Sequence, residues 1–183
     1  KGRDAFMKAY TSNNIRNIAV LGHGGKGKTT LCEAMLYLAG ATDRLGKVAD
    51  GNTVLDFDAE EKRKKSSVSS AMAAIEWDNT KLNIIDAPGL FDFENGSAEA
   101  VRAAEAVLIV TSAGSGVDVG TEKAFKAAEK RGLAKFFAIT KTDSDHRSFY
   151  KTFEALKEVY GNKLCPTIIP YMEGNITKSY VNL

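Results

Sequence analysis

The segment Gly22-His23-Gly24-Gly25-Lys26-Gly27-Lys28-Thr29 stands between an apolar run, Ile18–Leu21, and a helical pattern that continues to about Leu38. Its spacing, Gly-x4-Gly-Lys-Thr, is that of a P-loop. The glycines allow backbone N–H groups to approach a chain of phosphates, and the start of the following helix adds partial positive charge. In this interpretation Lys28 contacts the β- and γ-phosphates and the Thr29 hydroxyl contacts Mg²⁺. An ordinary glycine turn is the alternative, but here the strand, the signature and the helix occur together.

The composition limits the possible functions. The 183 residues suit one domain, and 25 basic against 23 acidic side chains leave the chain nearly neutral, so its bulk charge does not require a DNA partner. No apolar run approaches the ~20 residues of a membrane span, and Cys32 and Cys165 lack the spacing of metal ligands. We therefore expect a cytoplasmic monomer that binds neither DNA nor membrane.

A long connection and a hairpin follow the first helix, which should end at Gly40. Residues 40–70 are rich in Gly, Asp, Lys and Ser. A connection of this length is typically functional or mobile, so we expect disorder when no nucleotide is bound. Two strand patterns come next, Ala71–Trp77 and Leu82–Ile85, and the polar residues 78–81 between them favour a hairpin.

Short apolar runs then alternate with helical patterns. The runs Val107–Val110, Phe136–Ile139 and Ile168–Ile169 are typical of strands buried on both faces of a parallel sheet. The helical patterns between them end at Gly132 and Gly161. The sequence therefore predicts an α/β fold of the P-loop NTPase class, with a mostly parallel central sheet, helices on both of its faces and one antiparallel edge strand.

Acidic residues follow two of the predicted strands, at the edge of the sheet where ligands bind in such folds. Asp86 comes directly after Ile84-Ile85 and could hold Mg²⁺ through water, while Gly89 presents its N–H to a γ-phosphate. Asp143, in Thr140-Lys141-Thr142-Asp143, can accept the ring N–H and the exocyclic amine of guanine, which adenine does not offer in that arrangement. Taken alone, Asp86 could be a helix N-cap and Asp143 could be a turn residue. Both, however, follow a P-loop in the order that a nucleotide site requires, which favours a binding role.

The order P-loop, Asp-x-Pro-Gly, x-Lys-x-Asp is that of a GTPase, and the chain resembles the nucleotide-binding domain of elongation factor G and its paralogues over residues 14–183. The resemblance rests on Asn17–Val20, Gly46–Gly51, Asp56–Asp58, Asn83–Gly89, Gly116-Val117, Glu122, Phe149-Tyr150 and Pro166–Pro170. It implies a GTPase that binds GTP or GDP with Mg²⁺ and acts on the ribosome. It also implies that Ser67 stands where the family places a threonine that ligates Mg²⁺.

The resemblance implies a domain organisation as well. Residues 1–13 are interpreted as an N-terminal arm, in part foreign to the protein, and residues 14–172 as the GTP-binding domain. Residues 173–183 resemble the start of an inserted subdomain, and the fifth guanine-binding motif of the family lies beyond it. We therefore expect a fragment whose nucleotide affinity is weakened.

The chain departs from the family pattern at four places. Gly25 replaces an aspartate that helps to place a monovalent cation, and Lys64-Lys65-Ser66-Ser67 replaces Arg-Gly-Ile-Thr, although Ser67 keeps a hydroxyl. Thr140 replaces an asparagine and is expected to lose a hydrogen bond of about 0.5–1.5 kcal/mol in the base-binding loop. Leu90 replaces a histidine, which is the most serious change, because an aliphatic side chain cannot orient the attacking water.

The candidate residues fall into two groups. Nucleotide contacts are expected from Gly22, His23, Gly24, Gly25, Lys26, Gly27, Lys28, Thr29, Thr30, Asp86, Gly89, Thr140, Lys141 and Asp143. Mg²⁺ ligation is expected from Thr29 and Ser67, with Asp86 acting through water. No catalytic residue is assigned, because Leu90 occupies the position of the histidine. His23, at a variable position of the loop, is interpreted as a solvated or packing side chain without a catalytic role, and His146 as a surface residue.

Two other functions remain open. A GTP-dependent switch with little or no hydrolysis would account for Leu90. A partitioning-type ATPase carries the similar loop Lys-Gly-Gly-x-Gly-Lys-Thr-Thr, but His23 stands at its signature lysine and Asp143 favours guanine. Nucleotide competition tests the ATPase, and turnover with and without ribosomes tests the switch.

Overall fold

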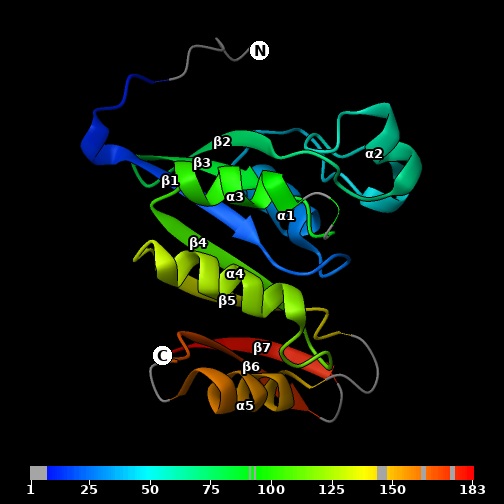
Figure 1. The fold of residues 1–183 in the computed structure, drawn as a ribbon, viewed down its shortest axis with the longest axis vertical. Coiled ribbons are helices and arrows are strands. Elements are labelled where there is room, and N and C mark those ends of the chain that lie inside the picture. Colours follow the sequence, from blue (N-terminus) through cyan, green and yellow to red (C-terminus); the bar gives the residue numbers. More distant parts are fainter. Residues whose placement is uncertain (1–7, 91, 93, 144–147, 162–163, 174–175) are drawn as a thin grey trace.

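The computed structural model describes residues 8–90, 92, 94–143, 148–161, 164–173 and 176–183 (Figure 1). The strands are β1 (Ile15–Leu21), β2 (Ala71–Trp77), β3 (Thr80–Asp86), β4 (Ala106–Ser112), β5 (Ala134–Thr140), β6 (Ile168–Glu173) and β7 (Ile176–Asn182). The helices are α1 (Lys28–Leu38), α2 (Ala59–Lys64), α3 (Glu94–Ala103), α4 (Val119–Lys130) and α5 (Phe149–Tyr160), with short 3₁₀ turns η1 (Ser12–Asn14) and η2 (Val48–Asp50).

The central sheet has five strands in the order β2-β3-β1-β4-β5. Strand β1 is parallel to both of its neighbours, β3 and β4, and β5 is parallel to β4. Strand β2 pairs antiparallel with β3 after a two-residue turn, in which Asp78 and Asn79 have φ angles of 44° and 58°. Two positive φ angles are what a type I′ hairpin turn requires. The predicted hairpin and the mostly parallel sheet with one antiparallel edge strand are confirmed.

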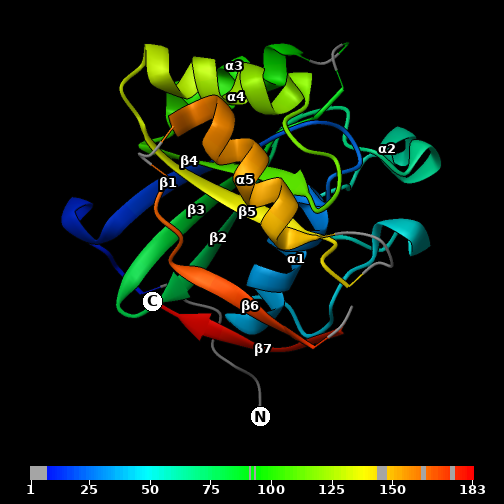
Figure 2. The same cartoon turned by 90° about the horizontal axis from the view of Figure 1, so that it is seen from below.

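Helices cover both faces of this sheet, and Figure 2 shows α3 and α4 on the face opposite to α1. Side chains of β1 alternate between the two cores, as the two-residue period of a strand requires. Val20 packs with Cys32 of α1, whereas Ala19 and Leu21 pack with Val101 of α3. Both faces of β1 are therefore buried, which fixes the start of the P-loop between two packed layers.

The prediction of a further buried parallel strand at Ile168–Ile169 is wrong. These residues begin β6, which pairs antiparallel with β7 in a separate two-stranded sheet. Among the described residues β5 has no strand on its outer side, and Phe136 is 59% exposed. A cavity of about 530 Å³, lined largely by apolar side chains, lies between β5, α5 and β6. A short apolar run alone does not distinguish a buried central strand from a strand of an outer hairpin.

The connection between α1 and β2 contains local structure that the sequence pattern did not predict. It contains η2 and α2, and α2 begins at Asp58 with a capping box completed by Glu61. Leu55 is buried in the core under α1, where the Glu33 carboxylate accepts the N–H groups of Val54 at 2.7 Å and Leu55 at 3.1 Å. Buried carboxylates therefore tie this segment to α1 and α2. Its disorder in the absence of nucleotide stays a prediction.

Helix ends follow the polar and glycine signals of the sequence. Helix α1 begins at Lys28 and ends in a Schellman turn, in which Gly40 has a φ of 70° and Ala41 N–H donates to Leu36 O at 2.9 Å. Asp118 and Ser148 cap the N-termini of α4 and α5. Over the parts of the chain given above, no helix combines the length and the apolar character needed to cross a bilayer.

Candidate functional site

The loop between β1 and α1 has the shape that its glycines predict. Gly22 has a φ of 136° and lies against the main chain of Val110 in β4, where a side chain would clash. Gly27 has a φ of 89° and is the N-cap of α1. The loop therefore closes tightly beside β4 and presents the free N–H groups of an 11-residue helix, which attract anions.

Lys28 lies in the first turn of α1 and is only 6% exposed. Its ammonium donates to the main-chain carbonyls of Gly22 at 3.0 Å and His23 at 3.1 Å. Burial lowers the pKa of Lys28, and the negative charge of Asp86 partly offsets this effect. Gly89 lies so close to the ammonium that a side chain at that position would clash with it. The structure thus brings the glycine after β3 to the P-loop lysine.

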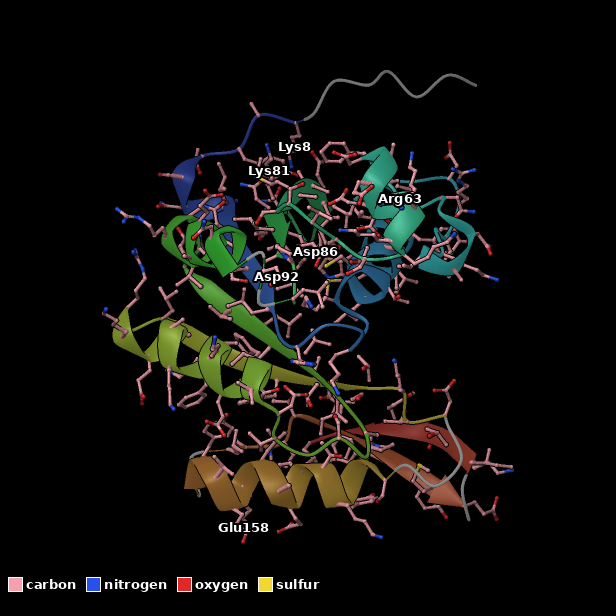
Figure 3. All side chains as sticks on the ribbon, turned by 45° about the vertical axis from the view of Figure 1, so that its right-hand side comes forward. Lys8, Arg63, Lys81, Asp86, Asp92 and Glu158 are labelled. Atoms are coloured by element: carbon pink, nitrogen blue, oxygen red, sulfur yellow. The ribbon has the colours of Figure 1, made fainter. Side chains whose placement is uncertain are left out.

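Three predicted cation ligands meet at the head of α1. Thr29 Oγ1 donates to Asp86 Oδ2 at 2.6 Å and lies 3.1 Å from Ser67 Oγ. The parallel pairing of β1 and β3, with Val20 opposite Asp86, places Asp86 beside the loop (Figure 3). Burial raises the pKa of Asp86 to about 7, against the opposing effects of the Thr29 hydrogen bond and the Lys28 charge.

The arrangement of oxygen atoms in this cluster suits a bound cation. Thr29 donates its hydroxyl proton to Asp86, and Ser67 donates its own to Asp56 Oδ1 at 2.7 Å. The two hydroxyl oxygens lie 3.1 Å apart, and Asp86 Oδ1 is buried without a hydrogen-bond partner. Oxygen atoms of this kind are what Mg²⁺ prefers, so the residues fit the ion. No group of three or more His, Cys, Asp or Glu side chains that could hold a metal occurs in the described ranges, and phosphates and water would complete the shell.

Asp56 is a member of the site to which the sequence alone assigned no role of its own. It is 3% exposed, and its carboxylate accepts from Ser67 and, at 3.2 Å, from Thr53 Oγ1. It therefore holds the Ser67 hydroxyl in place, with its oxygen 3.1 Å from that of Thr29. In the sequence, Asp56 belongs to the segment Asp56–Asp58, which contributes to the family resemblance but does not by itself indicate a contact with Ser67.

The predicted base-binding loop is docked on the P-loop. Thr140 Oγ1 lies 2.7 Å from the carbonyl of Lys26, to which it donates, and Lys141 Nζ donates to the carbonyl of Gly25 at 2.6 Å. The Thr140 hydroxyl thus joins the end of β5 to the P-loop. Asp143 is exposed in the turn after β5. His146 lies outside the described residues.

Leu90 lies over the P-loop. It is 40% exposed, and a methyl group added to Gly24 would come within 2.9 Å of Leu90 Cδ2. The same side chain lines an apolar cavity of about 170 Å³ together with Leu21, Val101 and Ala124. Hydrocarbon therefore packs against the loop at the position where the family resemblance led us to expect a histidine. Asp92 is exposed in the short segment that follows.

One open cavity of about 190 Å³ is lined by most of the predicted residues: Gly24, Gly25, Gly27, Lys28, Thr29, Thr30, Ser67, Gly89 and Lys141.

Lys26 has a different partner, because its ammonium lies 3.3 Å from the carboxylate of Asp118 at the start of α4. Gly120 in the first turn of α4 packs directly against the backbone of His23. The start of α4 therefore supports the P-loop, which was not predicted from the sequence.

Comparison with known proteins identifies relatives over most of the chain. Residues 13–178 match the family described as elongation factor Tu GTP binding domain. An elongation factor G-like protein of Mycobacterium tuberculosis is 35% identical over 96% of the chain, and the mitochondrial ribosome-releasing factor 2 of Debaryomyces hansenii is 34% identical over 93%. The chain spans 25% and 20% of the lengths of these two relatives.

Solved structures agree with this assignment of the fold. A crystal structure of a protein from Thermus thermophilus superposes with a TM-score of 0.87 and 37% identity, over 92% of this chain and 25% of that one. The bacterial selenocysteine-specific elongation factor EF-Sec gives a TM-score of 0.63 and 25% identity, over 78% of this chain and 22% of that one. The predicted P-loop fold class is confirmed, and a match to a GTP-binding family does not support the ATPase alternative.

Proposed function

Since this chain belongs to the elongation factor Tu GTP binding domain family, as its motifs predicted, we propose that it hydrolyses GTP to GDP and phosphate in connection with the ribosome. It is the GTP-binding domain of an elongation factor G-like translational GTPase. The ribosome enters as a proposed partner, because the relatives are elongation factor G-like and ribosome-releasing factors by name.

The observation that carries this proposal is the meeting of Thr29, Ser67 and Asp86 beside Lys28. Thr29 and Ser67 would hold Mg²⁺ directly and Asp86 through water, and the ion would neutralise part of the phosphate charge. Lys28 would exchange its bonds with the loop carbonyls for bonds with the β- and γ-phosphates. The N–H groups of the P-loop and of α1 would donate to the phosphate oxygens.

Guanine selection is proposed for Asp143. Its exposed carboxylate would accept two N–H donors of the base, and Thr140 and Lys141 fix the preceding segment to the P-loop.

We also propose that residues 14–172 form the GTP-binding domain and that residues 173–183 begin an inserted subdomain.

We expect hydrolysis by this chain to be very slow. Leu90 packs against Gly24 and has no group that can orient water or stabilise developing charge. The ribosome would have to supply some of the groups that orient the attacking water or stabilise the developing charge. The second candidate function, a GTP-dependent switch with little or no hydrolysis, is supported by the same placement of Leu90.

Two measurements test these proposals. In the first, GTP, GDP and ATP compete for the chain with a labelled GTP analogue, with Mg²⁺ and then with EDTA, and we expect only the guanine nucleotides to compete. In the second, multiple-turnover assays with and without ribosomes distinguish a GTPase from a switch. Displacement by ATP as effective as that by GTP would contradict the proposed function.

A further inference from the structure

Glu61 lies at the centre of the segment that delivers Ser67 to the cation site. Its side chain belongs to α2 but is only 1% exposed. Four donors converge on its carboxylate: Val68 N–H at 2.9 Å, Ser69 N–H at 3.2 Å and Ser69 Oγ at 3.3 Å on Oε1, and Asp58 N–H at 3.2 Å on Oε2. The carboxylate therefore joins the start of α2 to the first residues after Ser67.

Both chain neighbours of Ser67 are held by this one residue. Ser66 N–H donates to the main-chain carbonyl of Glu61 at 3.2 Å, and Val68 N–H donates to its side chain. Ser67 lies between these two hydrogen bonds, so its backbone is fixed from both sides. Its hydroxyl then reaches Asp56 at 2.7 Å and Thr29 at 3.1 Å.

We propose that Glu61 is a positioning residue, which sets the Ser67 hydroxyl in the Mg²⁺ site and so determines how tightly the chain holds Mg²⁺ with a nucleoside triphosphate. This inference rests on the proposed function, because Ser67 ligates Mg²⁺ only if the site binds nucleotide. Glu61 itself touches neither the ion nor the nucleotide. It acts through the backbone of residues 66–69.

The neighbouring Glu60 provides a matched contrast. It lies on the same helix and carries the same charge, but its carboxylate faces solvent and pairs with Arg63 at 2.7 Å and Lys64 at 3.3 Å. Arg63 is itself exposed, and Figure 3 shows it at α2, apart from Asp86. A role that depended only on charge or on the stability of α2 would involve Glu60 as much as Glu61.

The number of donors explains why a long carboxylate is needed. A buried N–H group without an acceptor is costly, and the two carboxylate oxygens accept from two sides, Oε1 from residues 68 and 69 and Oε2 from Asp58. Glu61→Asp keeps the charge but is one methylene group shorter, so it loses reach to Val68. Glu61→Gln keeps the reach and can offer its carbonyl oxygen to Val68 and Ser69, leaving only Asp58 N–H without an acceptor.

The test compares these variants in the 183-residue chain by titration with a non-hydrolysable GTP analogue and with GDP, in Mg²⁺ and in EDTA. We expect Glu61→Asp to weaken Mg²⁺-dependent binding of the analogue by about tenfold, the equivalent of one or two lost hydrogen bonds. Glu61→Gln should weaken it by less than about threefold, and Glu60→Gln should have no effect. GDP binding should change by less than about twofold in all three, which also shows that the variants are folded.

A double-mutant cycle tests whether Glu61 acts through Ser67. Glu61→Asp combined with Ser67→Ala should lose no more affinity than Ser67→Ala alone. Additive losses, a neutral Glu61→Asp, or equal losses in Glu60→Gln and Glu61→Asp would overturn the proposal. If Glu61→Asp fails to bind GDP because it does not fold, the isosteric Glu61→Gln decides, and a loss of about tenfold or more in that variant contradicts the positioning role.

Failure of the proposed function gives a different result. An unmodified chain that binds neither nucleotide, or binds the GTP analogue equally well in Mg²⁺ and in EDTA, contradicts the nucleotide site itself. An unmodified chain that shows the Mg²⁺ dependence but is unaffected by Glu61→Asp contradicts only the role of Glu61.

Discussion

Thr29 Oγ1 donates a 2.6 Å hydrogen bond to Asp86 Oδ2, although 57 residues separate them in the chain. Thr29 lies in the first turn of α1 and Asp86 ends β3, and the parallel pairing of β1 with β3 brings these ends together. The second oxygen of Asp86 is buried without a partner. The contact therefore joins the P-loop to the strand-end carboxylate at the point where a cation is expected.

Lys28→Ala should reduce the affinity for GTP and GDP by about 100-fold or more, because charge-assisted hydrogen bonds to phosphate are lost. Nucleotide titration measures the effect. Lys26→Ala is the control, since the Lys26 ammonium faces Asp118, and it should lose less than about fivefold. Equal losses in the two variants would mean that Lys28 has no special contact with the phosphates.

Asp143→Asn should weaken GTP binding by ~1–3 kcal/mol, because an amide presents a donor where guanine also presents one. Xanthosine triphosphate, which has a carbonyl at that position of the base, should gain affinity for the variant. Competition of both nucleotides against a labelled GTP analogue measures the change. Unchanged affinities for both would show that guanine is bound elsewhere.

Leu90→His should raise ribosome-dependent turnover by about tenfold or more when the remaining domains are supplied, because it introduces a group that can orient water. Leu90→Ala is the control, since it removes the hydrocarbon over Gly24 but adds no polar group. Steady-state phosphate release compares the two. Rapid turnover by the unmodified chain without ribosomes would show that Leu90 does not occupy the catalytic position.

Tyr160→Phe tests the pH dependence of stability. Tyr160 stacks on Phe125 with ring centroids 4.1 Å apart, its hydroxyl is buried without a partner, and burial raises the pKa of Tyr160 to about 12. The folded protein keeps this proton at pH values where an unfolded tyrosine, with a pKa of about 10, loses it. The contribution of this group to stability is therefore complete below about pH 10 and falls as the pH rises to about 12.

We expect Tyr160→Phe to change the free energy of unfolding at about pH 7 by less than about 0.5 kcal/mol, because no hydrogen bond is lost. Its stability should fall less than that of the unmodified chain between about pH 10 and about pH 12. Denaturant unfolding of both proteins at several pH values checks this. Parallel pH profiles would contradict the assigned pKa.

The sequence predicted the P-loop, the β2–β3 hairpin and the sheet covered by helices on both faces, because each of these features is encoded by residues close together in the chain. Gly22 and Gly27 adopt positive φ angles in the loop, and Asp78 and Asn79 adopt them in the hairpin turn. The strand-end positions of Asp86 and Asp143 followed from the alternation of apolar runs with helical patterns. The parallel pairing of β1 with β3 then places Asp86 beside Thr29, although the two residues are far apart in the sequence.

Features that depend on distant partners were missed. The apolar character of Ile168–Ile169 does not reveal that its partner is β7 and not β5. Glu61 belongs to a charged segment that suggests solvent exposure, yet its buried carboxylate accepts backbone N–H groups of the loop that follows. Glu33 lies in the largely apolar helix α1, and its buried carboxylate likewise accepts backbone N–H groups of a distant loop. The pairing of Lys26 with Asp118 likewise requires α4 to lie against the P-loop. These contacts are set by tertiary packing, which single-residue propensities do not contain.

The central claim is that Thr29, Ser67 and Asp86 form the Mg²⁺ site of a guanine nucleotide. Calorimetric titration of the 183-residue chain with a non-hydrolysable GTP analogue, in Mg²⁺ and in EDTA, with ATP present in excess, tests it most directly. We predict binding that is at least about tenfold tighter in Mg²⁺ and is not displaced by ATP. Binding that does not depend on Mg²⁺, or that ATP abolishes, would contradict the claim.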